Sequence, residues 1–209
     1  MSEEPKIKIV LVGESGVGKT NLIRVVNDES FQKEAISTIS SSYIEKDIIV
    51  NNKKFCYSLW DTVGQETYRS LNEMYIKDAK IVLVVFALND QKSYQETNFW
   101  INNAKGSLKK GKYLMALVGN KSDLVSEQEV TDEEVKKRAA ELEIDFTLTS
   151  AAEDAVGFRV FLEDMIKKFI KTIGFELKIE KTFNLNEEKK KEEKNENINN
   201  RKKKKKCCN

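Results

Sequence analysis

Gly13-Glu14-Ser15-Gly16-Val17-Gly18-Lys19-Thr20 follows the apolar run Ile9–Val12 and precedes a helical pattern over Asn21–Asn27. The stretch fits G-x-x-x-x-G-K-[ST], a pattern that binds nucleotide phosphates when a strand precedes it and a helix follows. Glycines let backbone N–H groups curl around phosphate oxygens, and the helix N-terminus adds positive potential. A flexible surface loop is the alternative, but the flanking strand and helix favour a phosphate site. We expect that site to use the Lys19 ammonium, the Thr20 hydroxyl on Mg²⁺, and the neighbouring residues Glu14, Ser15, Gly16, Val17, Gly18 and Asn21.

The composition of the 209-residue chain fits one folded domain followed by a tail. We place the domain at residues 1–174 and a disordered tail at 175–209, because Glu187–Lys206 is almost entirely Lys, Glu, Asn and Arg. No apolar run is long enough to span a bilayer and Met1–Lys6 has no signal-peptide core, so we expect a cytosolic protein. The net charge is +2 with no broad basic face, so nothing indicates nucleic-acid binding.

The inventory of reactive side chains excludes several chemistries. The chain has no histidine, which excludes Ser–His and Cys–His catalysis and histidine-ligated metals. Its three cysteines are Cys56, Cys207 and Cys208, which make neither a disulfide framework nor a metal-ligand spacing.

Strand-like and helical patterns alternate along the domain, which predicts a doubly wound α/β sheet. Ile81–Ala87 and Tyr113–Gly119 are continuous apolar runs, as expected for parallel strands buried on both faces. Thr131 with Glu134 fits a helix capping box. The other expected strands are Lys6–Val12, an Asn51-Asn52 hairpin of Ser42–Val50 with Lys53–Asp61, and Asp145–Thr149, and the expected helices are Ser93–Leu108, Thr131–Glu141 and an amphipathic run from Phe158 to Ile173.

Asn120-Lys121-Ser122-Asp123 follows one of these strands and indicates recognition of guanine. The Asp123 carboxylate can accept two N–H bonds from guanine, whereas adenine offers no such pair of donors. Asn120 can bond the base and tie this loop to the phosphate loop, and the stem of Lys121 can lie along the base. An ordinary strand-to-helix turn explains the four residues alone about as well, but their place downstream of a phosphate loop favours the guanine site.

Asp61-Thr62-Val63-Gly64-Gln65 ends the second strand of the hairpin. Asp61 stands where a carboxylate helps to hold Mg²⁺, the Gly64 backbone N–H can meet a γ-phosphate, and Gln65 can orient the attacking water. A plain polar turn is the alternative interpretation.

The phosphate loop, the Asp61–Gln65 stretch and the Asn120–Asp123 stretch, in this order along the chain, resemble the Ras superfamily of small GTPases over about residues 6–173. The resemblance implies a six-stranded, mostly parallel sheet of the P-loop GTPase type, with one antiparallel edge hairpin strand and helices on both faces. It implies binding of GTP or GDP with Mg²⁺ and slow hydrolysis of GTP. By position it also implies that Phe31 covers the guanine edge, that Thr38 binds Mg²⁺ and the γ-phosphate, and that Ser150, Ala151 and Ala152 form the last guanine loop.

Within that superfamily the chain is most similar to Rab proteins. The aromatic set Tyr43, Trp60 and Tyr75 resembles their effector patch, and Cys207-Cys208 resembles an ending that carries two geranylgeranyl groups. This likeness implies a monomer on the cytoplasmic face of an intracellular membrane, which cycles with the cytosol and regulates vesicle trafficking. Its implied partners are an exchange factor, a GTPase-activating protein, a GDP-dissociation inhibitor or escort protein, and effectors. Core packing of the aromatics and an accidental cysteine pair are the alternatives.

Some residues depart from the family pattern and keep other functions open. Val63 stands where Ala is usual, and Ser40-Ser41-Ser42 replaces the usual switch I residues. They motivate the alternative of a GTP-bound scaffold with little hydrolysis, although the presence of Gln65 opposes it. A Ras- or Rho-like signalling GTPase is the second alternative, which a single farnesyl group would favour. No arginine occurs at position 15 or around Thr38, so we expect slow intrinsic turnover that a partner accelerates.

Overall fold

A six-stranded sheet in the order β2-β3-β1-β4-β5-β6 forms the centre of the computed structural model, which describes residues 6–32, 42–62 and 74–173. The chain divides into two units, residues 1–169 and 170–209, and the sheet belongs to the first. The strands are β1 (Ile7–Val12), β2 (Ser42–Val50), β3 (Lys53–Asp61), β4 (Ile81–Ala87), β5 (Leu114–Asn120) and β6 (Asp145–Leu148).

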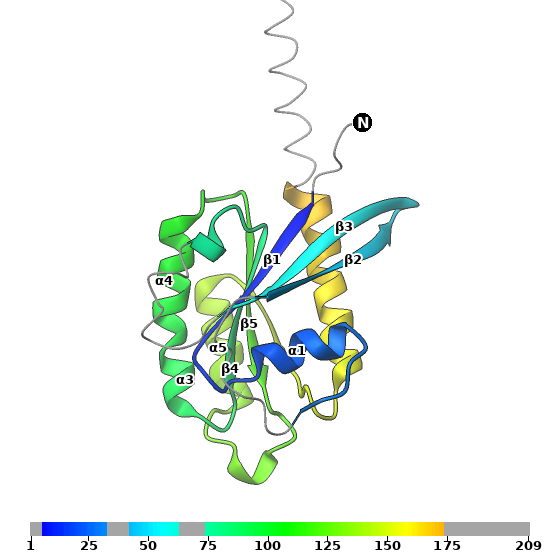
Figure 1. Cartoon of the computed structure of the whole chain (residues 1–209). Coiled ribbons are helices and arrows are strands. Elements are labelled where there is room, and N and C mark those ends of the chain that lie inside the picture. Colours follow the sequence, from blue (N-terminus) through cyan, green and yellow to red (C-terminus); the bar gives the residue numbers. More distant parts are fainter. Residues whose placement is uncertain (1–5, 33–41, 63–73, 174–209) are drawn as a thin grey trace, which may run out of the picture. The chain divides into compact units, whose positions relative to one another are not determined.

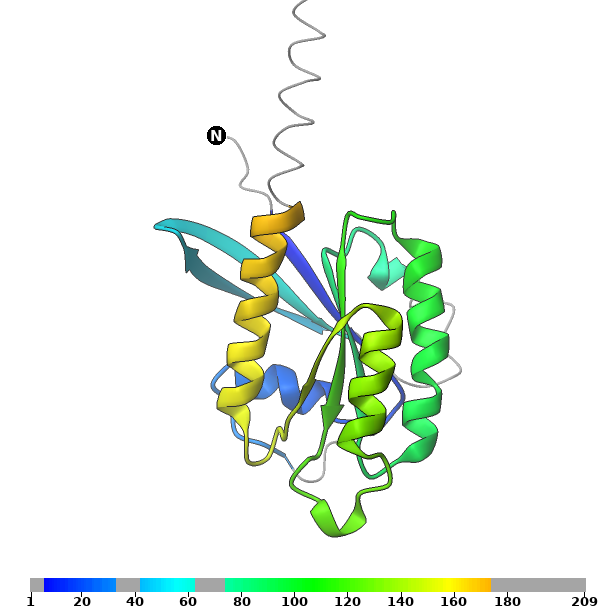
Figure 2. The same ribbon diagram turned by 180° about the vertical axis from the view of Figure 1, so that it is seen from behind.

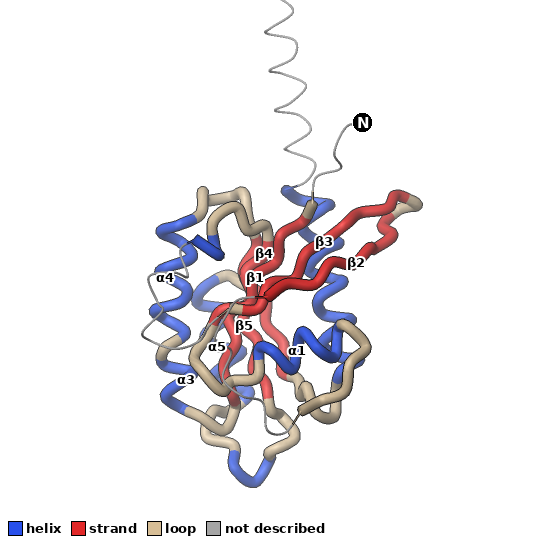
Figure 3. The backbone as a smooth tube through the Cα atoms, in the orientation of Figure 1, coloured by secondary structure: helices blue, strands red, loops and turns tan. Residues whose placement is uncertain are grey.

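The β2–β3 pair is antiparallel and every other pair in the sheet is parallel, which confirms the predicted mixed sheet with one edge hairpin. The hairpin turns at Asn51 and Asn52, whose φ angles are 51° and 59°. Asparagine tolerates this left-handed conformation, and two such residues make the tight turn that matches strand twist. Figure 3 shows the hairpin as a long ribbon that ends in this turn.

Both faces of the sheet are covered, as predicted. Figures 1 and 2 show α1 (Lys19–Val26) and the helix at 155–169 on one face, and α3 (Gln91–Gln95), α4 (Thr97–Ser107) and α5 (Asp132–Leu142) on the other. Alternate residues of the central strands are therefore buried on opposite sides of the sheet. Toward α4 and α5 lie Val10, Val12, Val82, Val84, Phe86, Met115 and Leu117, and the intervening Ile9, Leu11, Ile81, Leu83 and Val85 are buried as well.

The prediction of one helix over Ser93–Leu108 is wrong, because the helical segment starts earlier and is divided into two helices. The helical segment begins at Gln91, because Asp90 caps it by accepting a hydrogen bond from the Ser93 N–H at 3.0 Å. It is interrupted at Glu96, where the Thr97 hydroxyl donates to the Tyr94 carbonyl at 2.6 Å. Such local side-chain bonds compete with the regular helix ladder.

One predicted strand is shifted by one residue. The apolar run was expected to end at Gly119, but β5 continues through Asn120, which pairs with Ala87 of β4. Asn120 is therefore the buried last residue of β5, immediately before the loop, and its backbone position is set by the sheet.

No helix within residues 6–32, 42–62 and 74–173 is long and apolar enough to cross a bilayer. Residues 155–173 are helical, as the spacing from Phe158 to Ile173 predicted. The predicted tail at 175–209 lies outside the described residues.

Candidate nucleotide-binding site

The phosphate loop joins β1 to α1, and two of its glycines are required by close backbone approaches. Gly13 has φ +149°, and a Cβ there would lie 2.0 Å from the Val85 carbonyl oxygen of β4. Gly18 has φ +98°, and a Cβ there would lie 2.2 Å from the Asn120 amide nitrogen. Any side chain at either position would push the loop away from the strand ends, so the glycines hold it against the sheet.

Lys19 curls over this loop as the first residue of α1. Its Nζ donates to the carbonyl oxygens of Gly13 and Glu14 at 2.8 and 2.7 Å, and only 6% of the residue is exposed. Burial lowers the pKa of Lys19 from 10.5 to about 8, and the carboxylates of Asp61 and Glu14 offset part of that shift. An anion placed beside the ammonium would favour its charged form, which is the chemistry of a phosphate-binding lysine.

Thr20 and Asp61 bring two oxygen groups together next to Lys19. The Thr20 hydroxyl donates to Asp61 Oδ2 at 2.8 Å, and Asp61 is 1% exposed. Thr20 is the second residue of α1 and Asp61 ends β3, so the parallel pairing of β1 with β3 sets their approach.

This donor set fits Mg²⁺, which prefers oxygen ligands and is usually held by few protein groups together with phosphates and water. In the part of the chain that the structure describes there is no cluster of three or more carboxylates or thiols that could bind a metal without such help. The pair of Thr20 and Asp61 is thus suited to a metal that arrives with a nucleotide.

Asn120 links the phosphate loop to the loop after β6, which contains Ser150 and Ala151. Its Nδ2 donates to the Val17 carbonyl at 2.8 Å, and its Oδ1 accepts from the Ala151 N–H at 3.1 Å. The next residue, Lys121, has φ +66°, so the chain turns sharply after the strand. The expected tie between these loops is present, made by a side chain that is 2% exposed.

Asp123 and Ser150 join the loop after β5 to the loop after β6. The Ser150 hydroxyl donates to Asp123 Oδ1 at 2.5 Å and accepts from the N–H groups of Ala152 and Glu153 at 3.1 and 3.0 Å. The Ser122 N–H donates to the Thr149 carbonyl at 3.1 Å. The two loops therefore form one hydrogen-bonded unit, with the Asp123 carboxylate positioned by its neighbour.

One further predicted site residue lies within the described chain, and several others lie outside it. Phe31 is described and is 42% exposed. The predictions for Thr38, Gly64, Gln65, Cys207 and Cys208 concern residues outside the described ranges, as do Val63, Ser40 and Ser41.

Two of the three residues of the predicted aromatic patch form a stacked pair. The rings of Tyr43 and Trp60 stack with centroids 4.6 Å apart and an interplanar angle of 17°. Tyr43 is 51% exposed, whereas Trp60 and Tyr75 are half-buried. Trp60 also packs against the core, so the packing alternative holds for that ring.

The sequence interpretation missed Trp100, which is completely buried in α4 and supports the phosphate loop. Its indole N–H donates to a Glu14 carboxylate oxygen at 3.2 Å, across 86 residues of sequence. A large aromatic on a predicted helix gave no signal for this contact, because aromatic residues in helices are normally explained by core packing.

The fold and the loops together define a nucleotide-binding domain of the phosphate-loop class. The model of the Ras family matches residues 8–173, and the chain belongs to that family. It is therefore a small GTPase of the molecular-switch type.

Proposed function

We propose that this chain is a Rab-like switch that hydrolyses GTP to GDP and regulates vesicle trafficking from the cytoplasmic face of an intracellular membrane. The observation that carries the proposal is the hydrogen-bonded assembly of the phosphate loop with the Asn120 and Ser150 loops. It places a buried lysine, an oxygen pair suited to Mg²⁺ and a carboxylate suited to guanine at the ends of neighbouring strands.

In this mechanism each residue either positions the nucleotide and the attacking water or neutralises charge on the phosphates. Lys19 binds phosphate oxygens, and Asp123 accepts the two guanine N–H groups. Thr38 and Gly64 bind the γ-phosphate, and Gln65 orients the attacking water. Thr20, Asp61 and Thr38 would hold Mg²⁺, which would supply charge neutralisation at the phosphates. Loss of the γ-phosphate contacts releases the two switch loops.

The Rab-type role is supported by the stacked Tyr43–Trp60 pair and by the chain's end. The pair lies on the β2–β3 hairpin and leaves half of Tyr43 exposed for an effector. Cys207 and Cys208 follow six consecutive cations, and two lipids with a basic run satisfy the two-signal requirement for stable anchoring. The partners that follow are exchange and activating factors, a dissociation inhibitor or escort protein, and effectors, acting on a monomer.

The first test is single-turnover hydrolysis of preloaded GTP by the purified protein, with Gln65→Leu as the inactive control. We expect slow hydrolysis in the native chain that Gln65→Leu reduces by at least about tenfold, because orientation of the water is lost. Rapid hydrolysis without a partner would contradict the proposed dependence on an activator.

A rate equal to that of Gln65→Leu would instead favour the GTP-bound scaffold. The Val63→Ala variant then identifies the cause, because a β-branched side chain is stiff and restricts the backbone at this turn. Recovery of hydrolysis in Val63→Ala would assign the defect to that one side chain.

A further inference from the structure

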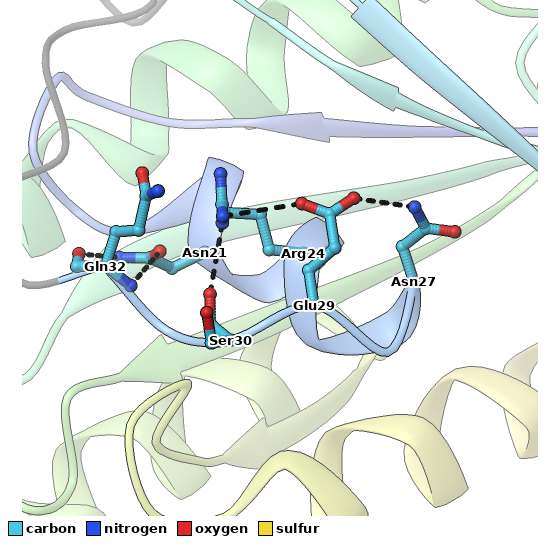
Figure 4. Close-up of polar contacts among 6 residues, drawn as sticks. All are labelled: Asn21, Arg24, Asn27, Glu29, Ser30 and Gln32. Atoms are coloured by element: carbon cyan, nitrogen blue, oxygen red, sulfur yellow. Dashed lines mark hydrogen bonds and ion pairs between the residues drawn. The ribbon is translucent and has the colours of Figure 1, made fainter.

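The chain that follows α1 turns back and runs along the same helix. Asp28 has φ +61°, which reverses the direction of the chain just after the helix ends. Side chains of α1 then contact successive backbone groups of the returning segment: Arg24 Nε donates to the Ser30 carbonyl at 3.2 Å, and Asn21 reaches Gln32. Figure 4 shows this antiparallel arrangement, with the returning segment held beside the helix.

The buried Asn21 side chain makes two hydrogen bonds to the returning segment, both to the backbone of Gln32. Its Nδ2 donates to the Gln32 carbonyl at 2.9 Å, and its Oδ1 accepts from the Gln32 N–H at 3.2 Å. The side-chain amide thus satisfies both backbone groups of one residue, as a neighbouring strand would. Asn21 is 7% exposed and directly follows Lys19-Thr20, so its two hydrogen bonds to Gln32 lie beside the phosphate loop.

The outer contacts are weaker. Asn27 Nδ2 donates to Glu29 Oε1 at 2.7 Å, and Arg24 forms an ion pair with Glu29 Oε2 at 3.5 Å. Exposed ion pairs of this kind contribute little to stability, and they guide the path of the segment more than they anchor it. The buried amide of Asn21 is therefore the main anchor of the segment's far end.

We propose that the Asn21 side chain is a positioning residue that slows nucleotide release by holding Phe31 at the guanine edge. Phe31 immediately precedes Gln32, so fixing both backbone groups of Gln32 fixes the peptide that carries the Phe31 ring. The inference rests on the proposed function, in which Phe31 covers the base. It assigns the Asn21 side chain a role separate from the backbone N–H that the helix N-terminus offers to phosphate.

The test is the rate at which a fluorescent GDP analogue leaves the Mg²⁺-loaded, full-length protein during a chase with excess GDP. We expect Asn21→Ala to speed release about tenfold, which corresponds to about 1.4 kcal/mol and is in the range of two modest hydrogen bonds. The variant keeps the backbone N–H. Asn98→Ala is the matched control, because Asn98 also donates its amide to a backbone carbonyl, that of Gln95 at 3.1 Å, on the exposed side of α4. Its release rate should equal that of the native chain.

A double-mutant cycle separates positioning from a general loss of stability. If Asn21 acts through Phe31, then Asn21→Ala should speed release by less than about twofold in a Phe31→Ala background, since coupled sites are non-additive. Full additivity, or an unchanged rate in the single variant, overturns the inference while nucleotide binding by the native chain preserves the proposed function. Failure of the native chain to bind the GDP analogue overturns both.

Discussion

At the scale of single residues, the phosphate loop depends on glycine for two different reasons, and they can be separated. Gly16 and Gly18 both have positive φ, at +77° and +98°. A Cβ at Gly16 would meet nothing within 4 Å, whereas at Gly18 it would collide with the Asn120 amide. An added side chain would strain the backbone at both positions. Only at Gly18 would it also displace the Asn120 amide that is bonded to the loop.

We therefore predict that Gly18→Ala destabilises the protein by about 2–4 kcal/mol, and Gly16→Ala by only about 1 kcal/mol. The measurement is chemical unfolding at one fixed, saturating concentration of GDP and Mg²⁺. Gly106→Ala in α4 is the control of opposite sign, because its helical site is open and alanine there should stabilise by about 0.5–1 kcal/mol. Equal losses at Gly16 and Gly18 would show that the Asn120 contact contributes nothing.

At the scale of elements, α5 begins with a reciprocal cap that responds to pH. The Thr131 hydroxyl accepts from the Glu134 N–H at 3.3 Å, and Glu134 Oε2 accepts from the Thr131 N–H at 2.8 Å. Hydrogen bonds from the backbone and the hydroxyl of Thr131 lower the pKa of Glu134 below 4.5. A lowered carboxyl pKa means that the cap stabilises the fold above the unfolded-state pKa, and that this contribution is lost as the pH falls through the folded-state value.

Two variants of this cap test the argument by thermal unfolding between pH 7 and pH 3. Thr131→Ala should cost about 1 kcal/mol at neutral pH. Glu134→Gln should lower the melting temperature at pH 7 and should converge on the native chain in acid, where the native carboxylate is protonated as well. Glu133→Gln, an acidic residue of the same turn outside the box, is the matched control. A gap between Glu134→Gln and the native chain that does not narrow in acid would refute the assignment.

The elements also show what could be read from sequence and what could not. The strands β2, β3 and β4 have the predicted bounds, because alternating or continuous apolar runs end at turn residues such as Asn51-Asn52. The extension of β5 to Asn120 depends on pairing with Ala87 of β4, which no local pattern encodes, and the break at Glu96 accompanies a local Thr97–Tyr94 bond that apolar spacing does not indicate. The same holds in the site: motif spacing predicted Lys19, Thr20 and Asn120, but the Trp100–Glu14 contact spans 86 residues and has no motif.

At the scale of the folded unit, the parallel strands bring together three loops that are far apart in the sequence. Loops that follow β1, β5 and β6 leave the same edge of the sheet, and side-chain bonds from Asn120 and Ser150 join them. A ligand that contacts all three loops binds only the folded chain. Its binding free energy is therefore added to the stability of the whole domain.

This linkage predicts a selective thermal shift in protein stripped of nucleotide. GDP with Mg²⁺ at about 100 times its dissociation constant should stabilise the fold by about 2.7 kcal/mol, whereas ATP with Mg²⁺ at the same concentration should leave the melting temperature unchanged. EDTA should remove part of the GDP effect, because the Thr20–Asp61 pair then has no metal to share with the phosphates. Asp123→Asn should reduce the shift given by GDP, because the residue proposed to accept the two guanine N–H groups would then carry an amide donor in place of one carboxylate oxygen. Asp164→Asn, an exposed position on the helix at 155–173, should behave as the native chain. An equal response to ATP and GDP would contradict guanine selection by Asp123, even if the phosphate loop bound both.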